Sequence, residues 1–373
     1  MEGMRGLDLS RRFFYDCVEP ILAERWPALR YSACLIGPGS EVLGFDDEVS
    51  RDHHWGPRVM LFLSRQNCER LADSISSHLS KRLPYTFLDY PTNFLAPDPA
   101  DGGTQLLHEI ESGPVRHRVE IQTLGGYLSS YLGIEDWRNI DERDWLTLPQ
   151  QKLASLVAGD VFRDDAEGAG GPLAQMRSAL SFYPRDVWLF QMAGAWARIG
   201  QEEHLMGRAG SVGDELGSAV IAGRLARDLM RLCFLIERRY APYPKWLGTA
   251  FKSLSCGPSL APTLHRAVTA SSWQDRERAL VPAYEAVATL HNALAVTETL
   301  PTTAKQFFGR GFRVLAIHGF ADALLGAIEG DLLTSATRRS PIGGIDFVSD
   351  NTDVLEDPGF RASLRGIYDS RPV

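Results

Sequence analysis

The sequence predicts an α+β protein, with a small α/β head built on a mixed β-sheet followed by an all-helical body. Short apolar runs alternate with helical patterns up to about residue 140, and long helical patterns follow. The length of 373 residues also exceeds the ~100–200 residues of one usual domain. We therefore expect two domains, residues 1–140 and 141–373, the second of which ends in a loop-rich tail.

The head alternates helices and strands. Before residue 100 the expected elements are an amphipathic helix over 8–24, strands over 31–36 and 59–63, a helix over 66–82 and an extended segment over 85–88. Two further runs, 106–111 and 115–124, flank Gly113-Pro114. Val119 and Ile121 alternate with polar neighbours in the second run, so this pair predicts a β-hairpin.

The body shows helical periodicity without strand signals. Helices are expected over 147–158, 172–180, 186–206, 213–240, 262–271, 275–296 and 303–333. A Gly-rich loop over 164–172 interrupts this half, and a loop-like tail begins at Ser340. We find no internal repeat.

Composition excludes several classes of protein. Acidic residues outnumber basic ones by 47 to 39, a net charge of −8, which argues against a protein that mainly coats duplex nucleic acid. Five scattered cysteines, with no CxxC pair, argue against a disulfide framework and favour a reducing compartment. No signal-peptide core and no run of ~18 apolar residues is present. We expect a soluble cytoplasmic protein.

The segment from Gly37 to Arg58 carries the clearest chemical signal. A Gly39-Ser40 turn directly after a strand offers backbone N–H groups and a hydroxyl, which suits a phosphate. Asp52 follows just before the next strand, and Glu120 lies in a later strand between apolar neighbours. Carboxylates from two strands beside such a turn would hold Mg²⁺ against a nucleoside triphosphate.

This arrangement resembles the nucleotidyltransferase superfamily, which includes polymerase-beta-like enzymes, aminoglycoside nucleotidyltransferases and minimal bacterial nucleotidyltransferases. Longer strings resemble a poorly characterised bacterial family of unknown function within it: GSEVLGFDDEVSRDHHWGPR, FYPRDVW, QEEHLMGRAGSVGDELGS and RLARDLMRLCFLIERRYAPYPKWLGTAF. The resemblance implies that Gly39 and Ser40 contact nucleotide phosphates. It also implies that Asp52 and Glu120 are the first and third metal carboxylates.

The second metal position of that family falls on His54, where the pattern has a carboxylate. Imidazole suits Zn²⁺, Mn²⁺, Ni²⁺ or Fe²⁺ better than Mg²⁺. Three alternatives follow: a softer metal, a single metal, or loss of transfer with nucleotide binding retained. The run Asp46-Asp47-Glu48 could supply a substitute carboxylate. His53 and His54 could equally be ordinary loop histidines.

The helical body offers further candidate residues. By resemblance to antibiotic-modifying nucleotidyltransferases, Glu202 or Glu203 could be the base for the acceptor; ordinary surface glutamates are the alternative. Arg227 belongs to an arginine face with Arg224, Arg231 and Arg238, which could grip a triphosphate or form internal ion pairs.

Beyond the arginine face, Lys245 follows Tyr240 and Tyr243 and could meet a phosphate while the rings stack on a base. The alternative is a helix end whose aromatic side chains fill the core.

We expect a metal-dependent nucleotidyltransferase that uses Mg²⁺ or Mn²⁺ to move AMP from ATP, or another nucleoside monophosphate, to a hydroxyl of a small-molecule or protein acceptor. The alternative is a catalytically decayed nucleotide-binding or interaction protein on the same fold. Expected partners are a nucleoside triphosphate and an acceptor. A membrane is not expected, and the absence of a basic surface interleaved with aromatics disfavours RNA.

Overall fold

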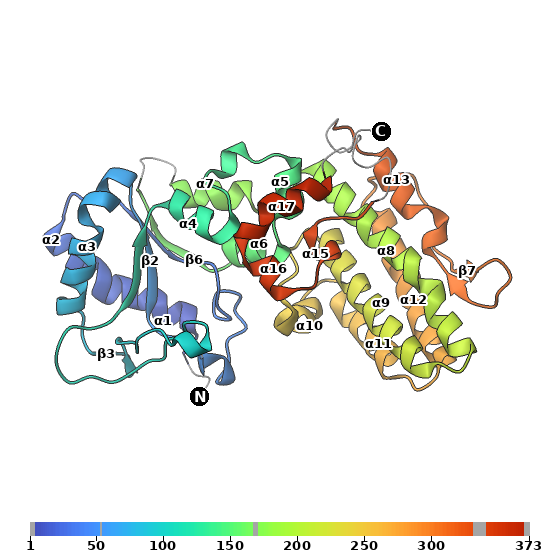
Figure 1. Ribbon diagram of the computed structural model, residues 1–373, viewed down its shortest axis with the longest axis horizontal. Helices are drawn as coiled ribbons and strands as arrows, with labels where there is room; N and C mark the ends of the chain where they lie inside the picture. Colours follow the sequence, from blue (N-terminus) through green and yellow to red (C-terminus); the bar gives the residue numbers. More distant parts are fainter. Residues whose placement is uncertain (1–3, 53, 167–170, 331–340, 369–373) are drawn as a thin grey trace. The chain divides into compact units, whose positions relative to one another are not determined.

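A four-stranded mixed sheet organises the first part of the chain (Figure 1). Its order is β5-β2-β1-β6, in which β1 is antiparallel to both of its neighbours and β2 is parallel to β5. The strands are β1 Ser32–Leu35, β2 Arg58–Phe62, β5 Arg118–Gln122 and β6 Asp160–Asp164.

The computed structural model describes residues 4–52, 54–166, 171–330 and 341–368, with the backbone alone described at residues 51 and 52. The chain forms two units, each with its own packing. The first unit contains residues 1–139 and 152–181, and the second contains residues 140–151 and 182–373.

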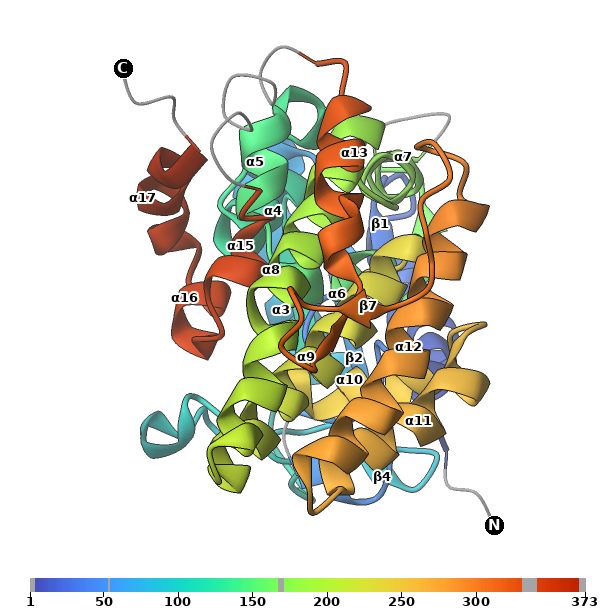
Figure 2. The same ribbon diagram turned by 90° about the vertical axis from the view of Figure 1, so that its right-hand side faces the viewer.

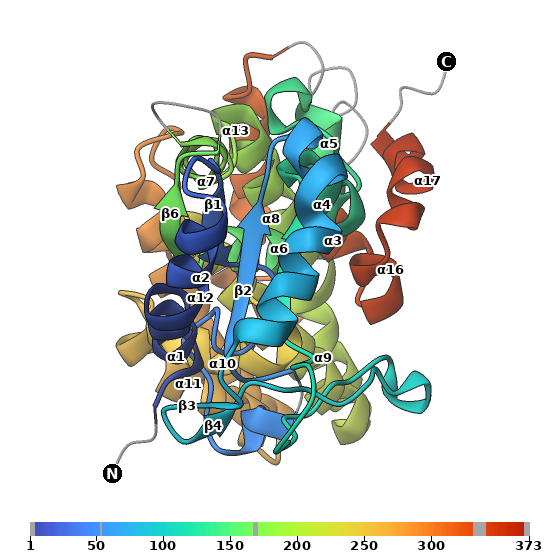
Figure 3. The same ribbon diagram turned by 90° about the vertical axis from the view of Figure 1, so that its left-hand side faces the viewer.

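Helices cover the core face of the sheet (Figure 3). They are α1 Gly6–Phe13, a π-helical turn Phe14–Val18, α2 Glu19–Arg25 and α3 Arg65–Arg82. Side chains alternate along each strand, so Val59 and Leu61 enter this core and Met60 points to the other face. The helices expected over 8–24 and 66–82 and the strands expected over 31–36 and 59–63 are confirmed.

The other ordered segments of the first unit are shorter. They are β3 Thr86–Phe87, β4 Tyr90–Pro91, α4 Leu124–Leu132, α7 Pro172–Ala179, most of α6 Gln150–Val157, and 3-10 turns at Val49–Asp52, Pro99–Asp101 and Trp137–Asn139. The α4 helix packs through Tyr127 against Phe62 of β2, with ring centroids 5.5 Å apart. This contact covers the sheet face opposite the core.

The predicted hairpin around Gly113-Pro114 is wrong. The run over 106–111 makes only an isolated bridge, between Leu107 and Phe94. The β5 strand pairs instead with β2, in parallel, so that Met60 lies opposite Glu120. A parallel neighbour needs a crossover, and α3 lies within the connection between these two strands.

The expectation that strands stop near residue 140 is also wrong. The β6 strand pairs with β1 from Ser32 to Leu35 and occupies one edge of the sheet. Three of its five residues are charged: Asp160, Arg163 and Asp164. Charged side chains are common on edge strands, and they hide the apolar alternation by which a strand is recognised.

The second unit is built from helices that pack side by side (Figure 2). They are α5 Glu142–Thr147, α8 Arg185–Ser211, α9 Glu215–Ile236, α10 Pro244–Lys252, α11 Gly257–Thr269, α12 Trp273–Ala293, α13 Phe320–Gly326, α15 Ile345–Val348, α16 Thr352–Glu356 and α17 Arg361–Arg365. The α+β class, with a small mixed sheet and a helical C-terminal region, is confirmed. No helix in the described ranges is long and apolar enough to cross a membrane.

The single helix expected over 303–333 is wrong. This stretch contains a small antiparallel pair, β7 Lys305–Gln306 with β8 Arg313–Val314, then a 3-10 turn Ala316–His318 and α13. Gly309, Gly311 and Gly319 have φ values of +73°, +79° and +85°. Such angles are outside the α-helical region, so these glycines break the periodic pattern. Residues 331–333 lie outside the described ranges.

Candidate functional site

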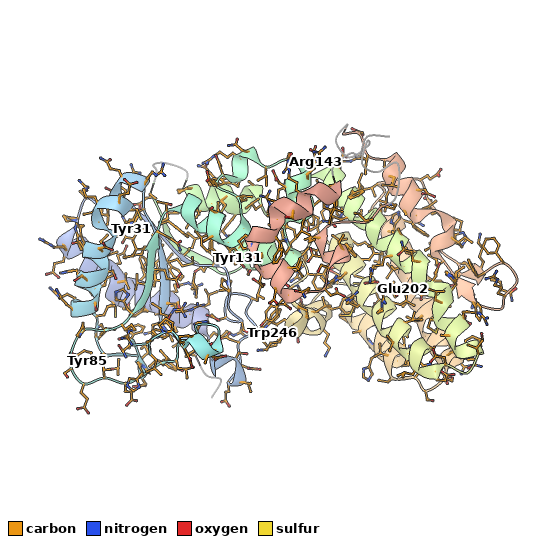
Figure 4. All side chains as sticks on the ribbon, in the orientation of Figure 1. Tyr31, Tyr85, Tyr131, Arg143, Glu202 and Trp246 are labelled. Atoms are coloured by element: carbon orange, nitrogen blue, oxygen red, sulfur yellow. The ribbon has the colours of Figure 1, made fainter. Side chains whose placement is uncertain are left out.

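A pocket of about 260 Å³ opens on the sheet face opposite the core of the first unit. Residues from the end of β1, from β2, from β5 and from α4 line it. Its polar side chains are those of Arg58, Arg118, Glu120, Gln122, Ser130, Tyr127 and Tyr131, the last of which is labelled in Figure 4.

The turn after β1 forms one wall of this pocket. Pro38 lines it, whereas the predicted phosphate-binding pair Gly39 and Ser40 is not among the lining residues. Gly37 and Gly39 have φ values of +84° and +144°, which glycine adopts without the penalty that a Cβ brings. Gly37 N also donates to Ser155 O at 2.9 Å. The path of the turn therefore depends on its glycines.

A buried ion pair fastens the turn to β2. Arg58 and Glu41 are 7% and 3% exposed, and Arg58 Nη2 donates to Glu41 Oε1. The same nitrogen donates to Pro38 O at 3.2 Å. Removing one partner of such a pair leaves an uncompensated buried charge and typically costs about 3–5 kcal/mol. The pair therefore holds one cation in a fixed place at the pocket.

The Arg118 guanidinium is shared between two partners. Its Nη2 donates to Glu120 Oε1 at 3.1 Å, and its Nη1 donates to His54 Nδ1. The Arg118 side chain is largely buried, whereas Glu120 is 45% exposed. Burial, followed by the nearby charge of Arg58, lowers the pKa of Arg118. The polar face of β5 thus presents a cation and a carboxylate side by side.

His54 is held by Arg118 and by the backbone of Gln105. His54 N donates to Gln105 O at 3.2 Å, and Gln105 N approaches His54 Nδ1 at 3.4 Å. A guanidinium can only donate, so Nδ1 must accept, and the neutral ring then carries its proton on Nε2. In this arrangement neither ring nitrogen offers a lone pair to a metal ion.

Tyr127 brings a buried hydroxyl to the same pocket. The side chain is 5% exposed, and its hydroxyl has no hydrogen-bond partner among the described residues. Burial raises the pKa of Tyr127 well above its ordinary value, so the hydroxyl keeps its proton and remains a donor. The Nε atoms of Arg58 and Arg118 likewise lack partners within the described part of the chain. Residues that line the pocket thus carry three buried donors without a partner among the described residues.

The predicted metal ligands are only partly described. Asp52 is the last residue of the 3-10 turn Val49–Asp52, and its side chain lies outside the described residues, as does His53. Among the described residues no group of three or more His, Cys, Asp or Glu could hold a metal ion. His54 and Glu120 do not fit a metal held between them, because the Arg118 guanidinium already contacts both.

In the run Asp46-Asp47-Glu48, which could have supplied a substitute metal ligand, the two aspartates accept hydrogen bonds from nearby residues. Asp46 Oδ2 accepts from Gly6 N at 2.8 Å and from Trp55 Nε1 at 3.1 Å. Asp47 Oδ1 accepts from both the backbone N–H and the hydroxyl of Ser50 at 2.8 Å. These bonds tie the loop to α1 and start the turn that ends at Asp52.

The candidate bases of the helical body lie on α8 in the second unit, where Figure 4 labels Glu202. Glu202 forms an ion pair with Arg224. Glu203 is 4% exposed and accepts from Leu315 N at 2.8 Å and from Ala316 N at 3.1 Å. Burial raises the pKa of Glu203 to about 7. Both glutamates thus make contacts within their own unit.

The arginine face on α9 also meets partners within the second unit. Arg227 pairs with Asp350 at 2.6 Å and with Asp228 at 3.4 Å. Arg231 donates to Asp346 O, and Arg238, which follows the end of α9, lies over the Trp188 ring at 4.2 Å.

Lys245 is the second residue of α10, and its Nζ lies 4.9 Å from the centroid of the Trp246 ring. Tyr240 is buried among Phe182 and Tyr183, with ring centroids 5.3 and 5.1 Å away.

Sequence reasoning found Glu120 but missed the side chains that surround it. Arg118, Glu120 and Gln122 share one face of β5 at a period of two, which is readable in the sequence. Tyr127 and Tyr131 are four residues apart on α4, so they share a helix face and their rings stack. Nothing in the sequence alone shows that both faces meet β2, which lies about 60 residues earlier, pairs with β5 and contacts Tyr127 through Phe62.

Comparison with family models matches residues 145–247 to a domain of unknown function, DUF4037. The matched stretch contains Glu202, Glu203, Arg227 and Lys245, and it does not reach the pocket residues of β2, β5 and α4. The comparison with curated proteins found no match to this chain.

Proposed function

We propose that the pocket of the first unit binds the phosphate groups of a nucleotide, with ATP as the first candidate. The supporting observation is that residues lining the pocket carry three buried donors without a partner in the described part of the chain: the Tyr127 hydroxyl and the Nε atoms of Arg58 and Arg118. A buried polar group without a partner is costly, and an anion accepts from several donors at once. Phosphate oxygens are acceptors of this kind.

Charge supports the same ligand class. Arg58 and Arg118 are close enough for each charge to act on the other, and Arg58 contributes to the lowered pKa of Arg118. Bringing an anion between like charges relieves their repulsion, and guanidinium groups recognise phosphate with two parallel hydrogen bonds. Glu41 and Glu120 each compensate one arginine, which keeps the pocket stable without ligand.

The size of the pocket limits how much of a nucleotide it encloses. A volume of about 260 Å³ is just below the ~300–1,000 Å³ of pockets that enclose a whole drug-sized ligand. We therefore assign the phosphate end to the pocket and leave the base outside it. The exposed part of Glu120 faces the same opening.

Metal-dependent nucleotidyl transfer is the second candidate function. It is favoured by the half-exposed Glu120 carboxylate at the pocket and by the resemblance that pairs Glu120 with Asp52. Transfer would join an acceptor hydroxyl to the α-phosphate of ATP and release pyrophosphate. For Glu120 to bind a metal ion in this way, Arg118 would first have to leave it.

Calorimetric titration with ATP tests the binding proposal. Tyr127→Phe removes only the unmatched hydroxyl, and hydrogen bonds to charged groups contribute about 1.5–3 kcal/mol, so ATP should bind at least about tenfold more weakly. Tyr284→Phe is the matched control, since Tyr284 has a buried hydroxyl without a described partner in the second unit. Equal affinity of wild type and Tyr127→Phe, or no binding by wild type, would contradict the proposal.

Release of pyrophosphate from ATP tests the transfer candidate. The assay would use Mg²⁺ or Mn²⁺ with aminoglycoside, sugar and protein acceptors, and Glu120→Gln should abolish any signal. Pyrophosphate release that is unchanged in both Glu120→Gln and Asp52→Ala would rule out transfer at this site. Binding without release would favour a nucleotide-binding protein.

A further inference from the structure

We infer that Arg118 takes the place of a bridging divalent cation, so that the pocket binds a nucleoside triphosphate that is not chelated by metal. This inference rests on the proposed phosphate-binding function and specifies the form of the ligand. The proposed site has a positively charged group between His54 and Glu120, as a metal centre would, but the group is a guanidinium.

The geometry of β5 explains why the guanidinium takes that position. Arg118 and Glu120 are two residues apart on one strand, so both side chains leave the same face. Arg118 spreads its two Nη atoms, one to Glu120 Oε1 and the other to His54 Nδ1. The planar fork of arginine suits two acceptors in this way, whereas lysine offers a single point charge.

The groups around Arg118 favour the guanidinium over a metal ion at this position. The Nδ1 lone pair of His54 is used by Arg118, and Glu120 shares its negative charge with the same group. A divalent ion would also meet the charge of Arg58, whose own carboxylate partner, Glu41, is 3% exposed. Mg²⁺ needs oxygen ligands in near-octahedral geometry, and this cluster offers it a half-exposed carboxylate already paired with a cation.

The consequence for the ligand is specific. The phosphates would be neutralised by Arg118 and Arg58, with the Tyr127 hydroxyl as a further donor. Magnesium chelation would remove charge from the phosphates before they reach the arginines. Free ATP should therefore bind at least as tightly as its magnesium complex.

Titration with ATP in EDTA, and again in excess Mg²⁺, tests the inference directly. We expect the Kd in EDTA to be equal to or lower than the Kd in Mg²⁺, and Arg118→Gln to raise the Kd in EDTA at least tenfold. Arg116→Gln is the matched control, because Arg116 lies two residues earlier and does not line the pocket. Circular dichroism would confirm that each variant is folded.

A second variant keeps the test decisive if Arg118→Gln does not fold. Glu120→Gln retains an oxygen acceptor for Arg118 and removes a negative charge from the pocket lining, so the Kd for ATP in EDTA should fall; a Kd that rises would overturn the role of Arg118. Electron paramagnetic resonance with Mn²⁺ alone would compare bound Mn²⁺ in wild type and in Glu120→Gln. We expect the same amount of bound Mn²⁺ in both proteins.

The outcomes separate the inference from the proposal beneath it. Binding of ATP only in the presence of Mg²⁺, or a Mn²⁺ site that depends on Glu120, overturns the role of Arg118 while phosphate binding stands. Absence of ATP binding in both buffers overturns phosphate binding, and the inference with it.

Discussion

The Tyr127 hydroxyl lies so close to the Cα of Gly37 that a Cβ added at position 37 would be 2.3 Å from the hydroxyl oxygen. Two segments distant in sequence, the turn after β1 and the helix after β5, therefore meet at a point where only glycine fits. The same hydroxyl is one of the unmatched donors of the pocket. The close contact with Gly37 therefore links the position of the Tyr127 hydroxyl, the proposed donor to the ligand, to the path of the turn after β1.

Gly37→Ala should destabilise the first unit by about 3 kcal/mol. The substitution places a Cβ against Tyr127 and also forces alanine to adopt a φ of +84°. Urea unfolding would measure the loss. Gly44→Ala is the control: Gly44 has a φ of +73°, but apart from Gly44 and its two chain neighbours no described residue has an atom within 4 Å of the place its Cβ would take. Only the backbone cost of about 1–2 kcal/mol then applies.

Tyr127→Phe should partly rescue Gly37→Ala. Without the hydroxyl, the nearest ring atom would be 3.5 Å from the new Cβ, which is ordinary van der Waals contact. The double variant should recover about 1–2 kcal/mol, because the backbone cost remains. A double-mutant cycle measures this coupling, and additive effects of the two substitutions would refute the contact.

Glu203 should make the second unit less stable as the pH rises toward neutrality. Burial raises its pKa from 4.5 to about 7, so its contribution is fully present below pH 4.5 and is lost as the pH rises to 7. The total change is on the order of 3 kcal/mol. Glu203→Gln should remove this slope in urea titrations at several pH values, whereas Glu202→Gln should keep it. Parallel slopes for wild type and Glu203→Gln would contradict the assignment.

His291 should have the opposite effect at acid pH. It is fully buried, Trp196 Nε1 donates to its Nδ1 at 3.2 Å, and burial lowers its pKa to about 4. Its contribution is present above pH 6.5 and is lost as the pH falls toward 4, again on the order of 3 kcal/mol. His291→Gln should flatten this part of the profile. A nuclear magnetic resonance titration that placed the His291 pKa near 6.5 would disprove the explanation.

Arg177→Met should destabilise the end of α6 by about 1–3 kcal/mol. Arg177 Nη2 donates to Val157 O at 2.6 Å and lies within 3.4 Å of the carbonyl oxygens of Ala158 and Gly159. Methionine keeps most of the aliphatic stem and leaves these carbonyls without the charged donor. Hydrogen exchange of residues 153–164 would report the loss, and exchange as slow as in wild type would show that the bonds do not matter.

Local patterns predicted much of the first unit. The helix over 66–82 and the strand over 59–63 have clear periodicity, and α3 and β2 follow it closely. Glu120 was identified because Val119 and Ile121 mark the opposite face of its strand. These features depend on residues that are neighbours in sequence, so a single sequence shows them.

The pocket itself depends on contacts that are distant in sequence. Arg58 and Glu41 are 17 positions apart, and Arg118 and His54 are 64 apart. No periodicity encodes which side chain meets which across such distances. His54 stands where the family pattern has a carboxylate, but its contact with Arg118 depends on the parallel pairing of β2 with β5, which no local pattern encodes.

The charged edge strand β6 matters for the design of a fragment that contains the sheet without the helical body. A fragment cut at residue 140 would lack β6, so β1 would have a bare edge from Ser32 to Leu35. It would also lose Ser155, whose carbonyl accepts from Gly37 N. Four apolar or small residues with unpaired backbone groups invite pairing with another chain. Such a fragment should aggregate, whereas one that joins residues 4–139 to 152–181 through a linker should stay dispersed and keep the pocket.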